Sequence, residues 1–460
     1  SRVRETDLSV PSPWGGYWYY SRTEEGRQYG IHCRRHGSVD ADEQVFLDQN
    51  ELAGASEYFA LGALDISPDH RLVAFSTDFN GSEKYTMRFR DIDRKRDLDD
   101  EIDETYYGTA WGSDNATFFY IRPDAAMRPY QVWRHVLGTP AADDVLVYQE
   151  DDDRFFVSVD RSKTGDYLTI SADSKITSEV RVLRADDPTG TFTVIEPRRQ
   201  GIEYSAYHYG DRWLILTNAD GAENFKLVEA PVGQPAADNW KDVVPHDPDV
   251  RLEGADVFRD HVVLYERGDG LRRIRIMHMA DGRIEVLPQP EEVYVTFGAG
   301  NPMFETTTLR YGYMSMITPS TIYDFDMDTH DRVMVKQQPV LGGYDPARYE
   351  TIREWATAAD GERIPISLVY RKGLARDGAN PALLYGYGSY EASMDPAFSS
   401  IRLSMLDRGF VFGIAHIRGG GEMGRRWYEN GKMGTKTNTF TDFIACAEHL
   451  IAEGFTTADR

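Results

Sequence analysis

DISPDHRLVAFSTDFNGSEKYTMRFRD, residues 65–91, contains a turn followed by two candidate β-strands. The turn is Asp65–Asp69, Leu72–Ser76 is a short apolar run, and Tyr85–Asp91 alternates apolar with polar residues. Similar units recur through the first 340 residues at a spacing of about 45 to 50 residues, the length of a four-stranded propeller blade. A single blade cannot bury both of its faces, so the repeat predicts blades stacked around an axis.

The repeat begins close to the N-terminus, where Tyr17–Tyr20 and Tyr29–Cys33 flank the polar segment Thr23–Gly26. Further units begin near residues 110, 156, 204 and 255, so six or seven blades fit before residue 340. An array of β-sandwiches would contain similar strands, but the steady period favours a β-propeller.

The pattern changes after Gly342, where buried strands begin to alternate with helices. Ile364–Tyr370, Ala382–Tyr385 and Phe410–Ile417 are expected to be strands, and Ser400–Asp407 suits a helix. A second helix is predicted over Thr439–Glu453, with one apolar face that contains Phe440, Phe443, Ile444, Ala447, Leu450 and Ile451. This alternation is typical of a doubly wound α/β sheet, of which about three strands would be present.

Composition narrows the class of protein. The formal net charge of −24 argues against nucleic-acid binding, which needs clustered Lys and Arg. No apolar run reaches about 18 residues, so no membrane span is expected. Ser1–Glu5 contains no apolar h-region, and no initiator Met is present, so we expect the natural N-terminus upstream. Only Cys33 and Cys446 occur, which favours a reducing, cytoplasmic setting.

Catalytic motifs are scarce in these 460 residues. No G-x-S-x-G nucleophile elbow occurs, and Ser389 lacks the second glycine. None of the 11 histidines has a metal-binding spacing such as H-E-x-x-H, and His416 fits a packed core histidine better than a base. Asp151–Asp153 is interpreted as a solvated turn. Gly419–Gly421 follows a strand but lacks the spacing of a nucleotide-binding loop.

The α/β segment resembles the prolyl oligopeptidase family of serine peptidases. The resemblance rests on Tyr385–Tyr390, Leu403–Phe410 and His416–Glu422. Ser21–Gly26 and Asn438–Phe443 are similar to the oligopeptidase B branch rather than to prolyl oligopeptidase itself. These motifs occur in order along essentially the whole chain.

The resemblance implies a seven-bladed β-propeller over residues 1–342, followed by the first part of an α/β-hydrolase domain over residues 343–460. It places the serine, aspartate and histidine of the catalytic triad downstream of Arg460. We therefore expect this chain alone to be inactive and to need the missing C-terminal catalytic segment as its partner. A short stretch of hydrolase domain that precedes the propeller in this family is also expected to be absent.

The resemblance also assigns individual residues. Tyr387, the second tyrosine of the Y-G-Y-G motif, would donate its hydroxyl to the oxyanion hole. Asp395 matches the first of two acids that receive basic substrate side chains, whereas the second position is Ala397. The sequence therefore does not predict a preference for a second basic residue beside the cleavage site. The alternative interpretation is that Asp395 is a turn residue before Pro396 with no contact to substrate. Arg418 and Glu422 are expected to hold the Gly-rich loop rather than to touch substrate.

The expected activity is cleavage of short basic peptides after Arg or Lys, with no cofactor or metal and the propeller acting as a size filter. Within the enzymes, the alternative is a prolyl oligopeptidase that cleaves after proline, which would carry an apolar pocket near its serine. From another class, the chain could be a non-catalytic propeller fragment that binds peptides or a partner protein.

Overall fold

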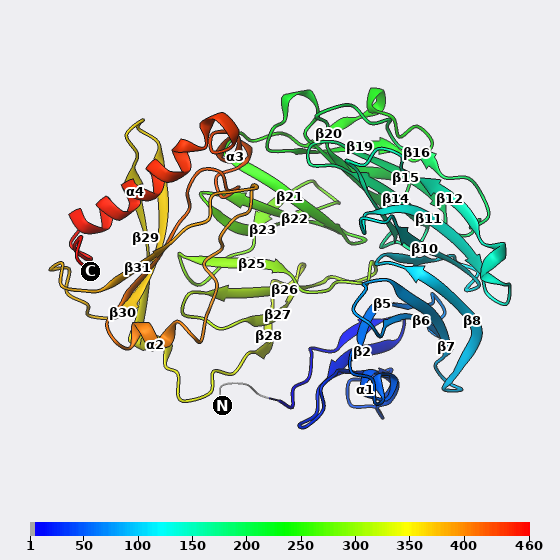
Figure 1. Cartoon of the computed structure of the whole chain (residues 1–460). Helices are drawn as coiled ribbons and strands as arrows, with labels where there is room; N and C mark the ends of the chain where they lie inside the picture. Colours follow the sequence, from blue (N-terminus) through cyan, green and yellow to red (C-terminus); the bar gives the residue numbers. More distant parts are fainter. Residues whose placement is uncertain (1–4) are drawn as a thin grey trace.

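The computed structural model describes residues 5–460, which form seven four-stranded sheets and one α/β unit (Figure 1). In each of the seven sheets the strands pair in chain order. The first three blades contain β1 (Ser12–Trp14), β2 (Tyr17–Arg22), β3 (Ile31–His36), β4 (Gln44–Asp48), α1 (Gln49–Ala53), β5 (Ala60–Ile66), β6 (Leu72–Asp78), β7 (Tyr85–Asp91), β8 (Arg96–Thr105), β9 (Thr109–Trp111), β10 (Thr117–Pro123), β11 (Pro129–Val136) and β12 (Val145–Gln149).

The remaining four blades complete a ring that Figure 1 shows in order from cyan to yellow-green. They contain β13 (Phe156–Arg161), β14 (Tyr167–Asp173), β15 (Ser178–Arg184), β16 (Thr193–Val194), β17 (Tyr204–Tyr209), β18 (Arg212–Thr217), β19 (Lys226–Pro231), β20 (Lys241–Val244), β21 (Val250–Val257), β22 (His261–Gly268), β23 (Leu271–His278), β24 (Ile284–Val286), β25 (Tyr294–Gly298), β26 (Thr308–Ser315), β27 (Thr321–Asp326) and β28 (Arg332–Gln337). The prediction of a seven-bladed propeller is confirmed.

Apolar residues of each blade pack against the next blade. Phe119 and Ile121 of β10 form one buried cluster with Val157 of β13, and Ile276 of β23 packs with Tyr311 of β26 in another. Burying both faces of a sheet in this way explains why inner strands such as β6 and β10 are buried along nearly their whole length instead of alternating.

Side-chain contacts join the first blade to the seventh. Arg310 Nη1 donates to the carbonyl oxygen of Pro11 at 2.6 Å, and Lys336 Nζ lies 2.9 Å from Asp7 Oδ1. Between residues 5 and 460, no strand is shared by these two sheets. The ring is therefore closed without a strand exchanged between its first and last blades.

The α/β unit follows β28 and is built on a four-stranded sheet ordered β29-β30-β32-β31. Its elements are β29 (Tyr349–Thr357), β30 (Arg363–Arg371), β31 (Ala382–Tyr385), α2 (Leu403–Leu406), β32 (Val411–Ala415), α3 (Arg425–Glu429) and α4 (Thr437–Ala452). The sheet is mixed, because β31 and β32 are parallel whereas the other pairs are antiparallel. Strand β29 was not predicted, since its charged residues obscure the apolar pattern.

Helices α4 and α2 cover opposite faces of this sheet. Ile366 and Leu368 of β30 pack with Leu450 of α4, whereas Val369 packs with Leu406 of α2. This alternation follows from the two-residue period of a strand. The predicted helix over 400–407 is shorter in the structure, a single turn.

The apolar face predicted for α4 was partly wrong. Phe440 and Ile444 are 62% and 55% exposed, and the residues that the helix buries are Thr439, Asp442, Cys446 and Leu450. The helix is rotated because Thr439 and Asp442 hydrogen-bond to the loop after β32, a polar contact that hydrophobic periodicity does not report.

Among the helices of residues 5–460, none combines the length and the apolar character needed to cross a bilayer. Cys33 and Cys446 are both buried and free.

Candidate active site

The carboxyl ends of β31 and β32 lie at the same edge of the α/β sheet, because the two strands are parallel neighbours. Tyr387 follows β31 by two residues, and Gly419–Gly421 lies just beyond β32. This edge is the usual position of ligand sites in open α/β sheets. Tyr387 is 44% exposed, and within residues 5–460 its hydroxyl has no hydrogen-bond partner. A phenol in this state is free to donate to a ligand.

Two glycines allow the loop after β31, residues 386–391 (the Tyr387 loop), to pack closely on Gly419–Gly421 (the Gly-rich loop). Gly388 and Gly419 have φ values of +62° and +101°, and a Cβ on Gly419 would overlap the carbonyl oxygen of Gly388. Glu391 N donates to the Gly419 carbonyl at 3.0 Å, and Lys436 Nζ donates to the Gly388 carbonyl. The backbone that follows Tyr387 is therefore fixed at Gly388 and at Glu391.

Arg418 and Asp442 anchor the Gly-rich loop to α4. The Arg418 guanidinium donates to both carboxylate oxygens of Asp442, at 2.8 and 2.6 Å, and its backbone N–H donates at 3.0 Å. Both side chains are almost fully buried. A charge-assisted bidentate pair of this kind fixes orientation as well as position. Arg418 thus holds the loop, as predicted.

The Tyr387 loop ends in two residues with an unusual backbone. Tyr390 and Glu391 have φ values of +55° and +64°, a conformation that L-residues other than Asn and Asp rarely adopt. The Glu391 carboxylate is paired with three cations, Arg251, Arg425 at 3.2 Å and Lys175 at 3.7 Å. Ion pairs with Arg251 and Lys175 of the propeller and with Arg425 of α3 therefore hold this strained segment. Strain of this kind is commonly found at functional sites.

One buried cluster contains a serine, a histidine and a carboxylate in the spatial order of a catalytic triad, but it does not act as one. Its members are Ser367, His416 and Glu422. Ser367 Oγ lies 2.7 Å from His416 Nε2, whereas His416 Nδ1 and Glu422 Oε1 are 4.0 Å apart, beyond hydrogen-bond range. All three are buried, and Arg353 Nη1 also contacts the Ser367 hydroxyl at 2.8 Å. Burial lowers the pKa of His416 well below its usual value. No substrate can reach this serine, so His416 is a core histidine, as predicted.

Glu422 is a buried acid below the Gly-rich loop. Oε1 accepts a hydrogen bond from Met394 N at 2.9 Å, so the side chain holds the loop that follows Tyr387. Burial raises the pKa of Glu422 to about 7. Above the ordinary glutamate pKa the unfolded chain has lost this proton, whereas the folded chain keeps it until about pH 7. The stability that comes from this proton is complete at acidic pH and is lost as the pH rises through 7.

We expect Glu422→Gln to remove this pH dependence. The quantity to compare is the free energy of unfolding of the variant minus that of the unchanged protein. This difference should be larger at pH 8 than at pH 5 by on the order of 2 to 3 kcal/mol, since each pKa unit is worth about 1.4 kcal/mol. Urea denaturation at both pH values measures the difference. Glu448→Gln, at an exposed position of α4, is the control and should show no such trend. An identical effect of Glu422→Gln at both pH values would contradict the assignment.

Asp395 bridges the α/β unit and the propeller. Its carboxylate lies 2.8 Å from Arg267 Nη1, and Arg267 Nε lies 3.0 Å from Glu253. The Arg267 side chain is fully buried, whereas that of Asp395 is 19% exposed. Asp395 therefore has a structural partner. A contact between Asp395 and substrate stays a prediction.

A cavity of about 450 Å³ lies between the propeller and the α/β unit. It is lined by Asp173, Ser174, Ser178, Glu203, Tyr204, Ser205, Leu216, Phe225, Arg251, Leu252, Glu253, Arg272, Glu391, Ser393 and Gly421. Glu253 and Glu391 are neutralised by ion pairs with arginines. Asp173 has no ion-pair partner within the described part of the chain, and Glu203 has one, Arg425 Nη1 at 3.3 Å, which it shares with Glu391.

Because Asp173 is unpaired and Glu203 shares its arginine with Glu391, these two carboxylates are the least neutralised of those in the cavity. Burial by surrounding protein, together with the charge of Glu203, raises the pKa of Asp173 to about 6. Burial likewise raises the pKa of Glu203. A cationic group in the cavity would relieve their repulsion and favour their charged forms. Sequence reasoning missed both residues, because they lie on different blades and match no local motif.

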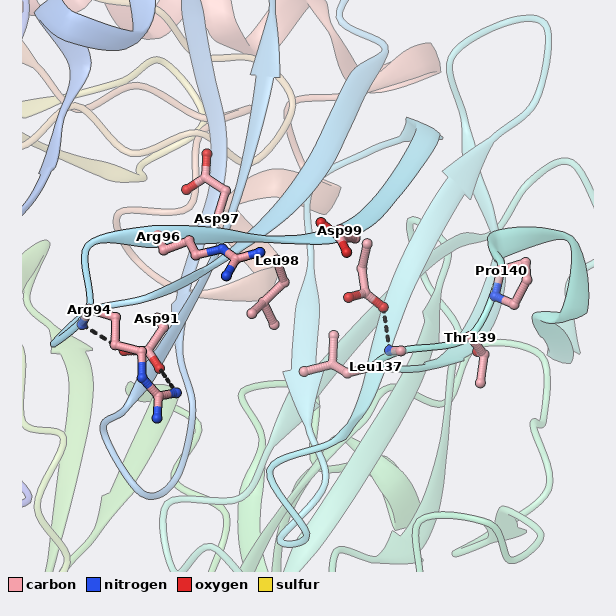
Figure 2. Close-up of a pocket in the computed structure, with 11 residues that line it drawn as sticks. Asp91, Arg94, Arg96, Asp97, Leu98, Asp99, Leu137, Thr139 and Pro140 are labelled. Atoms are coloured by element: carbon pink, nitrogen blue, oxygen red, sulfur yellow. Dashed lines mark hydrogen bonds and ion pairs between the residues drawn. The ribbon is translucent and has the colours of Figure 1, made fainter.

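A second, larger depression of about 650 Å³ lies on the outer part of the second and third blades (Figure 2). Asp91 is paired there with Arg94, as Figure 2 shows, and Asp100 accepts a hydrogen bond from Gly138 N. No residue of the α/β unit lines it. This depression is therefore separate from Tyr387, although its volume exceeds that of the cavity between the propeller and the α/β unit. Cavity volume alone does not identify the functional site.

Comparison with known proteins supports this view of the two parts. Residues 1–338 match the family model "Prolyl oligopeptidase, N-terminal beta-propeller domain", and residues 396–460 match "Prolyl oligopeptidase family". The chain is 44% identical to dipeptidyl aminopeptidase BI of Pseudoxanthomonas mexicana, over 100% of this chain and 66% of that protein. It is 35% identical to protease 2 of Moraxella lacunata, over 100% and 67%.

Solved structures give the same result. Oligopeptidase B from Leishmania major superimposes with a TM-score of 0.91 and 37% identity. Oligopeptidase B from Trypanosoma brucei, in a closed form with covalently bound antipain, superimposes with a TM-score of 0.91 and 38% identity. Each alignment covers 99% of this chain and 66% of the other. The chain thus spans about two thirds of the length of these relatives.

Proposed function

We propose, from the premise that this chain belongs to the prolyl oligopeptidase family, that the complete gene product is a serine peptidase that cleaves short peptides after Arg or Lys. The observation that carries the proposal is the exposed Tyr387 just after β31, whose hydroxyl has no partner within residues 5–460. The same loop continues to Glu391 and Ser393, which line a cavity that also contains Asp173 and Glu203. Family membership supports the serine chemistry, and the cavity supports the preference for basic peptides.

In the proposed mechanism, a serine that the family resemblance places after residue 460 attacks the peptide carbonyl. A histidine oriented by an aspartate takes the serine proton and delivers it to the leaving amine. Tyr387 donates a hydrogen bond to the oxygen that becomes negative in the tetrahedral intermediate. The fixed backbone around Gly388 keeps this donor in place before the reaction, so little reorganisation is needed.

Substrate selection is proposed to combine charge and access. The net charge of −24 attracts cationic peptides over long range, and Asp173 with Glu203 binds the basic side chain within the cavity. The propeller lies against the α/β unit through pairs such as Arg267 with Asp395. This arrangement admits short flexible peptides in preference to folded proteins.

A panel of fluorogenic peptides tests the proposal on the complete gene product. We expect amino-blocked arginyl and lysyl substrates to be cleaved with a kcat/KM at least tenfold above that of a blocked prolyl substrate. A preference for proline would instead support the prolyl oligopeptidase alternative. Absence of any hydrolysis would support the non-catalytic binding alternative.

The double variant Asp173→Asn and Glu203→Gln should lower kcat/KM for arginyl substrates by about 10- to 100-fold, because a hydrogen bond to a charged group contributes about 1.5 to 3 kcal/mol. Activity on an uncharged substrate should change much less. Asp99→Asn changes the net charge at an exposed position in the depression of Figure 2 and is the control. Equal losses on charged and uncharged substrates would contradict a role of these carboxylates in recognition.

Release of dipeptides from the amino terminus is a second candidate, favoured by the name of the 44% identical relative. Asp173 and Glu203 would then bind a free α-ammonium group instead of a side chain. Paired substrates with free and acetylated amino termini separate the two functions. A loss of cleavage on acetylation would support dipeptide release, and equal cleavage would support the endopeptidase.

A further inference from the structure

Three histidines and two carboxylates gather where the sixth and seventh blades meet, away from the α/β unit. His278 is the last residue of β23, Glu285 lies in β24, and His330 lies in the turn between β27 and β28. His261 and Asp328 are adjacent to them. These side chains have no part in the proposed peptidase, and the cluster lies beside a cavity of about 370 Å³ that Glu285 and His330 help to line.

The distances within the cluster suit a metal ion. His278 Nε2 and His330 Nε2 lie 3.0 and 2.9 Å from the same oxygen, Oε1 of Glu285. All three ligand atoms lie within 4.8 Å of one another. Metal bonds of about 2.1 Å to nitrogen and oxygen separate neighbouring ligand atoms by about 3.0 to 3.4 Å. Small side-chain adjustments would therefore place all three atoms around one ion.

The backbone that carries these ligands is well ordered by its own hydrogen bonds. In the seventh blade, His330 N donates to the Asp326 carbonyl at 2.9 Å, and the Asp326 carboxylate accepts from Asp328 N and Thr329 N. In the sixth blade, the β23–β24 turn is closed by hydrogen bonds from His278 N to the Arg283 carbonyl at 2.9 Å and from Gly282 N to the His278 carbonyl at 2.8 Å. The His330 ring also stacks on Phe325. Ligands held in this way lose little entropy when they bind an ion.

The protein contacts of the cluster leave histidine nitrogens incompletely satisfied. His278 Nε2 faces both Glu285 Oε1, a hydrogen-bond acceptor, and the donor Arg283 Nη2 at 3.0 Å, so a neutral imidazole cannot satisfy both contacts. His261 is 1% exposed, and its buried Nδ1 has no hydrogen-bond partner. Two imidazole nitrogens that converge on one carboxylate oxygen are a ligand set suited to a divalent transition metal.

We propose that His278, Glu285 and His330 bind a divalent transition-metal ion, of the class of Zn²⁺, that cross-links the sixth and seventh blades. His261 contacts the His278 ring, with centroids 4.8 Å apart, and supports its orientation. The role is structural: the ion joins a hairpin of one blade to a turn of the next. The exposed Arg283 lies 2.7 Å from Glu285 Oε2, so its guanidinium competes with the metal for the Glu285 carboxylate.

Calorimetric titration of the complete, tag-free gene product with ZnCl2 after chelator treatment tests the proposal. We expect saturable binding of one ion and a rise in Tm, because an ion that binds only the folded state stabilises it. His330→Ala and Glu285→Gln should each weaken binding by about 100-fold or more, since even loss of supporting groups costs about 10- to 100-fold. His330 is exposed, so the variant should fold normally.

Two further variants make the assignment specific. Arg283→Gln should tighten Zn²⁺ binding, because it removes the competing cation. His36→Ala, at an exposed histidine in the first blade, should leave binding unchanged. The proposal is overturned if the unchanged protein shows no saturable binding, or if its affinity persists within threefold in both His330→Ala and Glu285→Gln. A loss of binding in Asp328→Asn but not in His330→Ala would also overturn it.

Discussion

Replacing Tyr387 with phenylalanine lowers kcat of the complete gene product by about 100- to 1,000-fold, the effect of removing one oxyanion-hole donor. The hydroxyl is exposed and has no partner in the described structure, so its removal should leave folding unchanged. KM should change little, because the hydrogen bond strengthens only as negative charge develops on the carbonyl oxygen. Steady-state kinetics with a blocked arginyl substrate measures both constants.

Tyr385→Phe is the matched control for this prediction. Tyr385 is the last residue of β31, belongs to the same sequence motif and is 46% exposed. We expect its kcat to fall less than threefold. Equal effects of the two substitutions, or an unchanged kcat in Tyr387→Phe, would remove Tyr387 from the proposed mechanism.

Gly419→Ala should be strongly destabilising and should also abolish most activity. Gly419 has φ +101°, and an added methyl group would overlap the Gly388 carbonyl. Backbone strain and overpacking each cost about 1 to 3 kcal/mol, so the free energy of unfolding should fall by about 2 to 6 kcal/mol. Because the clash pushes on the residue next to Tyr387, activity should decline even under conditions where the variant remains folded.

Gly434→Ala provides the comparison in the same region. A Cβ at Gly434 meets no atom within 4 Å, and φ is not positive there. Its stability should change by less than about 1 kcal/mol. Urea denaturation of both variants measures the difference. If Gly419→Ala were as stable as Gly434→Ala, close approach of the two loops would not be what fixes the site.

The propeller could be predicted because its evidence is local and repeated. Units such as Leu72–Ser76 with Tyr85–Asp91 recur at a constant spacing, and each unit predicts a sheet that must stack on its neighbours. Strand β29 escaped prediction because Glu350, Arg353 and Glu354 interrupt its apolar residues. The face of α4 was predicted partly wrongly because Asp442 is buried by a specific ion pair with Arg418.

From the sequence, candidate site residues could be named only where a short motif contains them, and the role of Tyr387 stays a prediction. Tyr387 lies in such a motif, whereas Asp173 and Glu203 come together through the packing of separate blades. Asp395 and Arg267 are 128 positions apart in the sequence, and their pairing depends on how the α/β unit lies on the propeller. The histidine cluster has the same property, since His278 and His330 belong to different blades. Contacts of this kind follow from tertiary structure and leave no local pattern.

Fluorophosphonate labelling of the complete gene product, followed by intact and peptide mass spectrometry, tests the central claim most directly. The account predicts one label per molecule, on a serine outside residues 1–460. Absence of labelling would contradict the assignment as a serine peptidase. A label on Ser367 or Ser389 would contradict the proposed location of the nucleophile.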